Sequence, residues 1–477
     1  MTRITLLTMS ALVFLCAEES NAKVYHVGAG KAYTMPSQLM NLVTDGDTVE
    51  IDAGLYSGDV GTWHANNLVI RGVAGYAHLE ANGKNAGGKA IWVITGNNTY
   101  IENIEFSGCT VKDQNGAGIR QEGVTLELRH CYFHDNDDGV LTNADPNSDI
   151  LFEACEFARN GFGDGFSHNM YIGNVRSFTM RFCYSHHAKI GHCVKSRAMN
   201  NFIMYNRIMD EDTGSSSYLI NLPNGGFSII LGNTMMKGPY AQNSVLVDYG
   251  SEGLSNPSKQ LFVVNNTMIS TRANGATFVR NVSSNDTAAQ IINNIFAGKG
   301  SVSGGIAYTA GNTNSADTSV LHFVDAPHFD YHLKSTSIFY NNHGVDPGNA
   351  NGFSLTPTKE YIHPTDSTNR EDKVTLIPGA FSIFTKGLRQ AVDGTPAVIF
   401  PNPLHERATI TLSGVEDGYT VGLCVYDILG RQCQIEKVSV TNSKIIFIPK
   451  NLQPAVYHYI LTDAQARIIG TGGFVIE

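Results

Sequence analysis

Four short segments in the middle of the chain place polar side chains at corresponding positions. They are His168-Asn169-Met170-Tyr171, His192-Cys193-Val194-Lys195-Ser196-Arg197, Tyr218-Leu219-Ile220-Asn221 and Val245-Leu246-Val247-Asp248. In each segment an apolar residue is followed directly by a polar one, which is typical of a strand with one buried face. The pattern predicts a buried row of Met170, Val194, Ile220 and Val247 and an outward column of Tyr171, Lys195, Asn221 and Asp248.

These residue types suit β-elimination on a uronate polysaccharide. The proton at C5 of a uronate is weakly acidic, so cleavage needs a neutralised carboxylate, a base at C5 and an acid for the leaving oxygen. We expect Lys195 to be the base, because the nearby cation Arg197 favours the neutral amine. Tyr171 is the expected proton donor. Arg197 is expected to bind the substrate carboxylate, with a substrate-binding set of Asn169, Asn221, Asn224 and Asp248.

Two histidines extend this catalytic set, and alternative roles remain open. His168 and His192 stand at strand starts, where histidines act as general acids or bases or only stack at a corner of the fold. Lys195 and Arg197 are either catalytic or ordinary solvated side chains that pair with Asp248.

A second polar cluster runs from His134 to Gly139. Its carboxylates, Asp135, Asp137 and Asp138, predict a Ca²⁺ site made of hard oxygen ligands, and the alternative is a polar turn. The run loosely resembles the Asn-x-Asp-Gly element of polygalacturonase-type hydrolases, but the next coil offers no matching carboxylate pair. No organic cofactor is expected, because the chain has no glycine-rich phosphate loop.

The segments that could do chemistry lie within a longer repeat. Stretches such as ENIEFSG from Glu102, RHCYFHD from Arg129 and EACEFAR from Glu153 recur at steps of 23 to 33 residues. Their alignment predicts one column of Phe106, Phe133, Phe157, Ser185, Ile208, Met235, Met268 and Phe296. Such a period with short alternating strands predicts an all-β fold, a right-handed parallel β-helix with about three strands in each coil.

The column that precedes it changes from cysteine to asparagine. It reads Cys131, Cys155, Cys183, Asn206, Asn233, Asn266 and Asn294. We expect the cysteines to stack inside as small apolar groups, and each asparagine to bond its neighbour in the next coil at a turn that tolerates positive φ. Cys424 and Cys433 lie outside this column and are close enough in sequence to form a disulfide.

Composition narrows the class of protein. Lys and Arg number 33 against 43 Asp and Glu, a net charge of −10 that argues against a nucleic-acid partner. The apolar share of 42% excludes a disordered chain. A short apolar run at residues 4–16 followed by Ser20-Asn21-Ala22 predicts a signal peptide over 1–22, and no transmembrane segment is expected. We therefore expect a secreted or cell-surface protein.

Both ends of the repeat resemble known proteins. The phrase Asp45-Gly46-Asp47-Thr48-Val49 and the closing segment around Glu360-Tyr361-Ile362-His363-Pro364 resemble bacterial right-handed β-helix repeat proteins of the polysaccharide-lyase-like group, which sets the β-helix at 23–383. Some lyases of this fold use a Lys and Arg pair on adjacent coils, whereas Lys195 and Arg197 share one coil.

The segment 397–477, after a linker at 384–396, differs from the repeat. Alternating strands predict a small β-sandwich. The motifs Phe400-Pro401-Asn402-Pro403, Val425-Tyr426-Asp427-Ile428-Leu429-Gly430-Arg431 and Asn451-Leu452-Gln453-Pro454 resemble the type A C-terminal sorting domain of the type IX secretion system of the Bacteroidetes. The resemblance implies the secretion machinery as a partner.

Three functions follow from the sequence. A polysaccharide lyase acting on an acidic glycan is favoured. A glycoside hydrolase or epimerase on the same scaffold and a non-catalytic adhesin or glycan-binding protein are the alternatives, because a fold does not fix the site that it carries.

Overall fold

The computed structural model describes most of the chain. The described residues are 22–282, 287–334, 336–337, 339, 344–370, 377–382, 398–404, 407–412, 418–427, 431–441, 443–450, 452–462 and 468–476. The expected signal peptide, apart from its last residue, and the expected linker at 384–396 lie outside these residues. No helix of the described part is long and apolar enough to cross a membrane.

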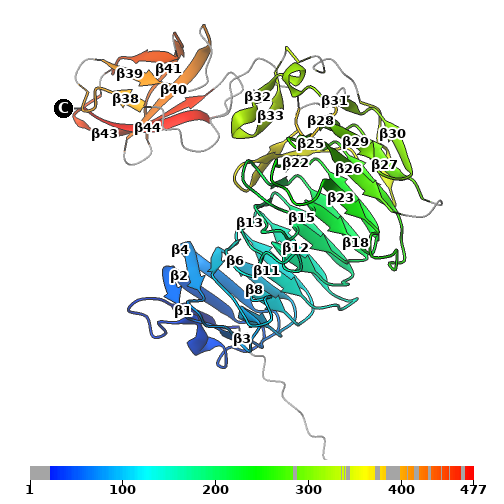
Figure 1. Ribbon diagram of the computed structural model, residues 1–477. Helices are drawn as coiled ribbons and strands as arrows, with labels where there is room; N and C mark the ends of the chain where they lie inside the picture. The colour runs from blue at the N-terminus through cyan, green and yellow to red at the C-terminus, as the bar shows by residue number, and fades with distance from the viewer. Residues whose placement is uncertain are drawn as a thin grey trace, which may run out of the picture.

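Residues 24–315 form a parallel β-solenoid with three sheets (Figure 1). Sheet I contains β3 (Gly61–Trp63), β5 (Ala90–Ile94), β8 (Ala117–Gln121), β11 (Asp138–Thr142), β14 (Met170–Ile172), β17 (Val194–Ser196), β20 (Ile220–Leu222), β23 (Val245–Tyr249), β26 (Ala276–Asn281) and β29 (Gly300–Ser303). Sheet II contains β6 (Thr99–Glu102), β9 (Leu126–Arg129), β12 (Asp149–Glu153), β15 (Ser177–Arg181), β18 (Asn200–Met204), β21 (Phe227–Leu231), β24 (Leu261–Val264), β27 (Ala289–Ile292) and β30 (Ala307–Ala310).

Sheet III follows sheet II in every coil. It contains β7 (Ile104–Ser107), β10 (Tyr132–His134), β13 (Glu156–Ala158), β16 (Tyr184–His186), β19 (Arg207–Met209), β22 (Thr234–Lys237), β25 (Thr267–Ser270), β28 (Ile295–Ala297) and β31 (Thr313–Ser315). At the first coils, β1 (Val24–Val27), β2 (Thr48–Ser57) and β4 (Val69–Glu80) join the same stack, and the short 3-10 helix η1 (Pro36–Leu39) lies between β1 and β2. Long β2 and β4 bend from sheet II into sheet III.

The repeat column of the sequence is confirmed as an inward column of sheet III. Phe133 is the parallel partner of Phe106 on one side and of Phe157 on the other. The column continues through Ser185, Ile208, Met235, Met268 and Phe296. The first three rings stack with centroids 4.9 and 5.1 Å apart, and every member is at most 1% exposed. The inward side chains of each coil therefore pack directly on those of the preceding coil.

The corner between sheets II and III holds the predicted asparagine ladder. Asn206 Nδ2 donates to Asn233 Oδ1 at 2.9 Å, and Asn233 Nδ2 donates to Asn266 Oδ1 at 3.0 Å. Contrary to expectation, the residue with positive φ is the one before the ladder position, such as Tyr205 at +56° and Asn265 at +50°. That residue makes the turn, which leaves the following asparagine to point inward and satisfy buried amides.

The segment after the solenoid covers two of the three sheets. It contains η2 (Thr318–Leu321), β32 (Phe323–Asp325), η3 (Ala326–His328), β33 (Asp330–Leu333), β34 (Asn349–Ala350), β35 (Phe353–Ser354), β36 (Lys359–Ile362) and β37 (Asp366–Asn369). Tyr331 and Leu333 pack in one buried cluster with Met236 of sheet III, and Leu355 packs in another with Ile229 of sheet II. The outer surfaces of sheets II and III are therefore partly buried in the later coils.

The C-terminal residues form the predicted β-sandwich. One sheet has the order β38 (Val398–Phe400), β39 (Ala408–Thr411), β42 (Lys444–Phe447), and the other has β41 (Gln432–Ser439), β40 (Thr420–Asp427), β43 (Ala455–Thr462), β44 (Ile468–Ile476). All pairs are antiparallel, and Phe447 meets Phe474 across the core with centroids 5.2 Å apart. Cys424 and Cys433, for which the sequence left a disulfide open, are both free thiols.

Candidate active site

The predicted outward column lies on the outer surface of sheet I. Tyr171 of β14 is the parallel partner of Lys195 in β17, Lys195 of Asn221 in β20, and Asn221 of Asp248 in β23. The predicted buried row of Met170, Val194, Ile220 and Val247 is fully inaccessible to solvent. Alternation along very short strands thus places four polar side chains in one line.

Tyr171, Lys195 and Arg197 form a compact group on two neighbouring coils. Lys195 Nζ lies 5.1 Å from the centroid of the Tyr171 ring, and the guanidinium carbon of Arg197 lies 5.6 Å from it. Arg197 Nε donates a 2.7 Å hydrogen bond to the Tyr171 hydroxyl oxygen. Both cations of the next coil therefore lie close to the phenol, and Tyr171 also packs against an outward apolar cluster that includes Val93 and Leu141.

A glutamate that was not predicted closes the group. Glu252 Oε1 lies 3.6 Å from Lys195 Nζ, and its Oε2 accepts a hydrogen bond from Arg197. Arg197 also donates to Asn224 Oδ1, one coil further along. The alternative interpretation of the sequence expected Lys195 and Arg197 to pair with Asp248. In the structure their partner is Glu252.

The segment that carries Glu252 is held to the solenoid by several hydrogen bonds, including those of one buried side chain. Asn256 is 4% exposed, and its Nδ2 donates to the carbonyl oxygens of Arg197, Ala198 and Gly225. Asn256 Oδ1 accepts from Asn174 Nδ2 at 2.9 Å. Residues 250–256 are thereby held over the end of the polar column.

Burial changes the basicity of Lys195. Its side chain is 13% exposed. Burial lowers the pKa of Lys195 below its ordinary value of 10.5, and Arg197 acts in the same direction, while Glu252 acts against both. This combination favours the neutral amine that a general base requires.

Two members of the predicted substrate-binding set are covered. Asn221 is 2% exposed and Asp248 is inaccessible to solvent. Asn221 Nδ2 donates to Asp248 Oδ2 at 2.6 Å, and Arg280 Nε donates to Asp248 Oδ1 at 2.6 Å. The hydroxyl of Ser251 also donates to this carboxylate. The two residues support the end of the column and do not face a substrate.

The two predicted catalytic histidines are a buried stacked pair. Their ring centroids are 4.5 Å apart, and His168 is inaccessible to solvent. His168 Nδ1 accepts from the His192 amide and His192 Nδ1 accepts from the Tyr218 amide, so each neutral ring carries its proton on Nε2. Burial lowers the pKa of His192 to about 3 and that of His168 well below its ordinary value. Both remain neutral at physiological pH, which does not suit a general acid.

Asn169 is structural and not a substrate ligand. It is fully buried, and its Oδ1 accepts from Asn160 while its Nδ2 donates to Ser185 Oγ and to the carbonyl oxygens of Phe157 and His186. It extends an inner ladder that starts at Asn136, whose Nδ2 donates to Asn160 Oδ1.

The three aspartates predicted to bind Ca²⁺ face different partners. Asp135 pairs with Arg159 and lies 2.9 Å from His134 Nδ1. Asp137 accepts the amides of Val111 and Gly116, and Asp138 accepts the amide of His168. The structure therefore does not bring Asp135, Asp137 and Asp138 together as one ligand set.

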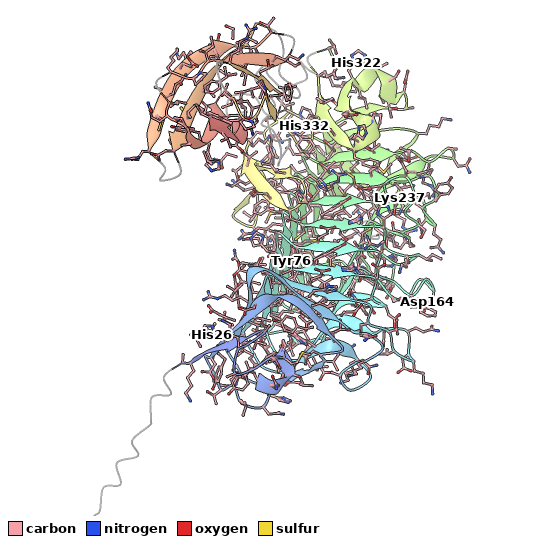
Figure 2. All side chains as sticks on the ribbon, turned by 90° about the vertical axis from the view of Figure 1, so that its left-hand side faces the viewer. His26, Tyr76, Asp164, Lys237, His322 and His332 are labelled. Atoms are coloured by element: carbon pink, nitrogen blue, oxygen red, sulfur yellow. The ribbon has the colours of Figure 1, made fainter. Side chains whose placement is uncertain are left out.

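Two exposed phenylalanines stand beside the entrance to β14. Phe162 and Phe166 are 51% and 83% exposed in the segment that leads from sheet III to His168. Gly161, Gly163 and Gly165 in this segment have positive φ values of 118°, 103° and 88°, which side chains other than glycine rarely adopt. Asp164 of the same segment lies at the edge of the stack in Figure 2. Exposed aromatic rings at such an edge offer flat apolar surface to a ligand.

One family model and one solved structure support the fold. A sequence family described as "Right handed beta helix region" matches residues 53–235. The pectate lyase Pel9A has a similar structure, with a TM-score of 0.50 and 13% identity over 76% of this chain and 97% of that one. An alginate lyase of family PL6 covers 76% of this chain and 57% of its own at 13% identity, and a pectin methylesterase from Aspergillus niger covers 62% and 86% at 12%. Their TM-scores are 0.26 and 0.28. No curated protein matches the chain.

Proposed function

We propose that this right-handed β-helix protein is a polysaccharide lyase that cleaves an acidic, uronate-containing glycan on the outer surface of sheet I. The observation that carries the proposal is the arrangement of Lys195, Arg197 and Glu252. The lysine and the arginine already hold one carboxylate between them. A substrate carboxylate has the same charge and the same acceptor oxygens as Glu252, so it fits the guanidinium of Arg197 beside the amine of Lys195.

Each step of the elimination has a candidate residue. Arg197 binds and neutralises the uronate carboxylate, which makes the C5 proton more acidic. The neutral amine of Lys195 takes that proton, and the electron pair of the C5–H bond forms the C4–C5 double bond as the C4–O bond breaks. The Tyr171 hydroxyl gives its proton to the leaving oxygen, and the lysine proton later restores the phenol through solvent.

The exposed rings of Phe162 and Phe166 suit a further role. Apolar ring faces pack against the C–H faces of sugars, which positions a polymer without using charge. The three glycines between and before these rings allow the segment to turn sharply next to His168.

The direct test is to incubate the purified protein with alginate, polygalacturonate and a neutral glycan, with Ca²⁺ or a chelator. A rise in the ultraviolet absorbance of an unsaturated uronate on one acidic glycan, lost in Lys195→Gln and kept in the exposed control Lys299→Gln, supports the proposal. New reducing ends without that absorbance indicate a hydrolase. Retention of glycan with neither product indicates a binding protein. Either result overturns elimination.

We also propose that the C-terminal β-sandwich directs export by the type IX secretion machinery, so that the enzyme acts outside the cell. Support comes from the order of its motifs and from the seven strands, which pack around one buried cluster. Deletion of residues 398–476 is expected to retain the solenoid inside the producing cell, as measured by immunoblotting of cell and medium fractions. Equal release of the shortened chain would contradict the proposal.

A further inference from the structure

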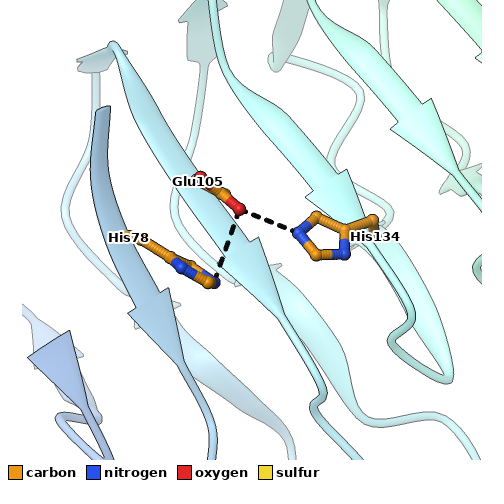
Figure 3. A group of neighbouring side chains, drawn as sticks. All are labelled: His78, Glu105 and His134. Atoms are coloured by element: carbon orange, nitrogen blue, oxygen red, sulfur yellow. Dashed lines mark hydrogen bonds and ion pairs between the residues drawn. The ribbon is translucent and has the colours of Figure 1, made fainter. Parts of the chain in front are cut away.

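A second cluster of titratable side chains lies on the outer surface of sheet III, in three consecutive coils (Figure 3). His78 belongs to β4, Glu105 to β7 and His134 to β10. His78 and Glu105 are direct parallel partners, while His134 is the partner of Ser107, two residues beyond Glu105. The three side chains therefore meet diagonally across neighbouring strands.

Both imidazoles lie close to the same carboxylate oxygen, and His78 Nε2 also lies 2.7 Å from Ser107 Oγ. Glu105 Oε1 lies 3.0 Å from His134 Nε2 and 3.5 Å from His78 Nε2. One ligand atom from each residue lies within 4.8 Å of the other two. The side chains of His78, Glu105 and His134 are 27%, 21% and 16% exposed, so solvent reaches the group while the strands hold it in place.

An outer layer of contacts orients His134. Its Nδ1 lies 2.9 Å from Asp135 Oδ2, and that carboxylate in turn binds Arg159 through Nε and a terminal nitrogen. A carboxylate on the far nitrogen of a metal-binding histidine fixes its ring and its tautomer. Asp135, part of the run that the sequence suggested for Ca²⁺, therefore takes this supporting position.

We propose that His78 Nε2, Glu105 Oε1 and His134 Nε2 bind one zinc-class divalent transition metal ion. Two imidazoles and one carboxylate suit Zn²⁺ and not Ca²⁺ or Mg²⁺, which prefer all-oxygen sites. Tetrahedral Zn²⁺ with ligands at about 2.0–2.1 Å needs donors roughly 3.3 Å apart, close to the two distances to Glu105. Three protein ligands leave the fourth position to water.

The same strand pattern recurs two coils later without the third ligand. Glu156 Oε1 lies 3.2 Å from His186 Nε2, as Glu105 lies near His134. The coil before Glu156 offers Tyr132 at the position where the coil before Glu105 offers His78. Within the part of the chain that the structure describes, only the His78 group brings three histidine, cysteine or carboxylate ligands together. His186 is therefore a matched control.

The test is a Zn²⁺ titration of the untagged, metal-free protein by calorimetry, with Co²⁺ absorption as a second readout. We expect one equivalent of Zn²⁺ to bind, a rise in Tm on binding, and a visible Co²⁺ spectrum of tetrahedral intensity. His78→Ala and His134→Ala should each weaken binding by at least about tenfold, whereas His186→Ala should not change it.

Three outcomes overturn the site. They are no binding by the wild-type protein, unchanged binding in both His78→Ala and His134→Ala, and an equal loss in His186→Ala. The Tm of each metal-free variant shows whether its solenoid is intact. His78→Gln replaces His78→Ala if the latter fails to fold. Because the group lies on sheet III and the proposed lyase site on sheet I, each proposal can fail without the other.

Discussion

Arg197 donates from Nε to the hydroxyl oxygen of Tyr171 at 2.7 Å, so the proton of that hydroxyl is free to be donated elsewhere. This contact places a cation on the oxygen that would become a phenolate, which stabilises the charge left after proton donation. The two residues lie on neighbouring coils, joined by the partner positions Tyr171 and Lys195.

Replacement of this phenol tests proton donation to the leaving oxygen. We expect Tyr171→Phe to lower kcat by about 10²–10⁴-fold with little change in KM, because the ring and its packing remain while the acid is lost. Steady-state rates on the acidic glycan that gives the ultraviolet signal in the substrate test provide the measurement. Tyr308→Phe, on an exposed ring elsewhere, is the control, and an unaltered kcat in Tyr171→Phe would exclude the role.

The basicity of Lys195 predicts the shape of the pH profile. Because burial lowers its pKa below 10.5, kcat/KM should rise with pH through a midpoint below that value as the amine loses its proton. Lys195→Arg keeps the charge but cannot lose a proton, so we expect it to lower kcat by about 10²–10⁴-fold. A pH series from neutral to alkaline conditions measures both effects. A profile of the wild type that is flat over this range would contradict a lysine base.

Removal of the Glu252 charge should improve substrate binding and shift the same profile. Glu252 raises the pKa of Lys195, so Glu252→Gln lowers it further and moves the rising limb to lower pH. KM for a polyuronate should fall by about fivefold, which corresponds to roughly 1 kcal/mol. The Gln side chain no longer competes with the substrate carboxylate for Arg197, and it no longer repels that carboxylate. Glu436→Gln, in the C-terminal sandwich, is the control. A higher KM in Glu252→Gln would instead make this carboxylate part of the binding machinery.

The buried histidine pair predicts acid sensitivity of the fold. The pKa of His192 is about 3 in the folded protein and near 6.5 when the chain is unfolded. The unfolded state therefore binds more protons between these values, so stability from His192 is fully present above about pH 6.5 and is lost as the pH falls toward 3.

Replacement by a ring that does not titrate isolates this contribution. In His192→Phe, the free energy of unfolding measured in urea should change less with pH between pH 4 and 6 than in the wild type. The difference in slope should be up to about 1.4 kcal/mol per pH unit. The neighbouring His168 keeps its own dependence of the same sign. Parallel pH curves for the wild type and the variant would show that His192 already titrates normally.

The asparagine ladder should carry a large share of local stability. Asn233 is fully buried, accepts from the amide and Nδ2 of Asn206, and donates to Asn266 Oδ1 and the Ile203 carbonyl oxygen. Asn233→Ala leaves buried donors of Asn206 unpaired, at a cost of about 1–3 kcal/mol for each group. Chemical denaturation measures the loss, with the exposed Asn314→Ala as the control. An effect no larger than that of the control would contradict this role.

The sequence predicted contacts that follow the repeat. A parallel stack joins residues one coil apart, so aligning the stretches was enough to place Tyr171 beside Lys195 and Phe133 beside Phe106. Glu105 and His134 lie in aligned stretches but in different columns, and His78 lies before the first aligned stretch, so the alignment did not bring the three together.

The sequence did not predict contacts at the corners and in the long connections. Strand alternation fails where the chain turns, since Asn169 and Met170 are both fully buried although they are adjacent. Glu252 meets Arg197 across 55 positions in sequence, from a segment that has no equivalent in other coils. No local pattern indicates such a contact, because the segment is held by hydrogen bonds to other coils, including those that Asn256 donates.

The connection that carries Glu252 has a consequence for how this protein can change. Between β20 and β21 the chain needs only residues 223–226, whereas between β23 and β24 it uses 250–260, yet the partner positions of both sheets stay in step. The longer connection therefore leaves the register of the strands unchanged, although Asn256 within it is hydrogen-bonded to the solenoid. Its other residues can be exchanged, by evolution or by design, to change what lies over Lys195 and Arg197 while the strands beneath keep their partners.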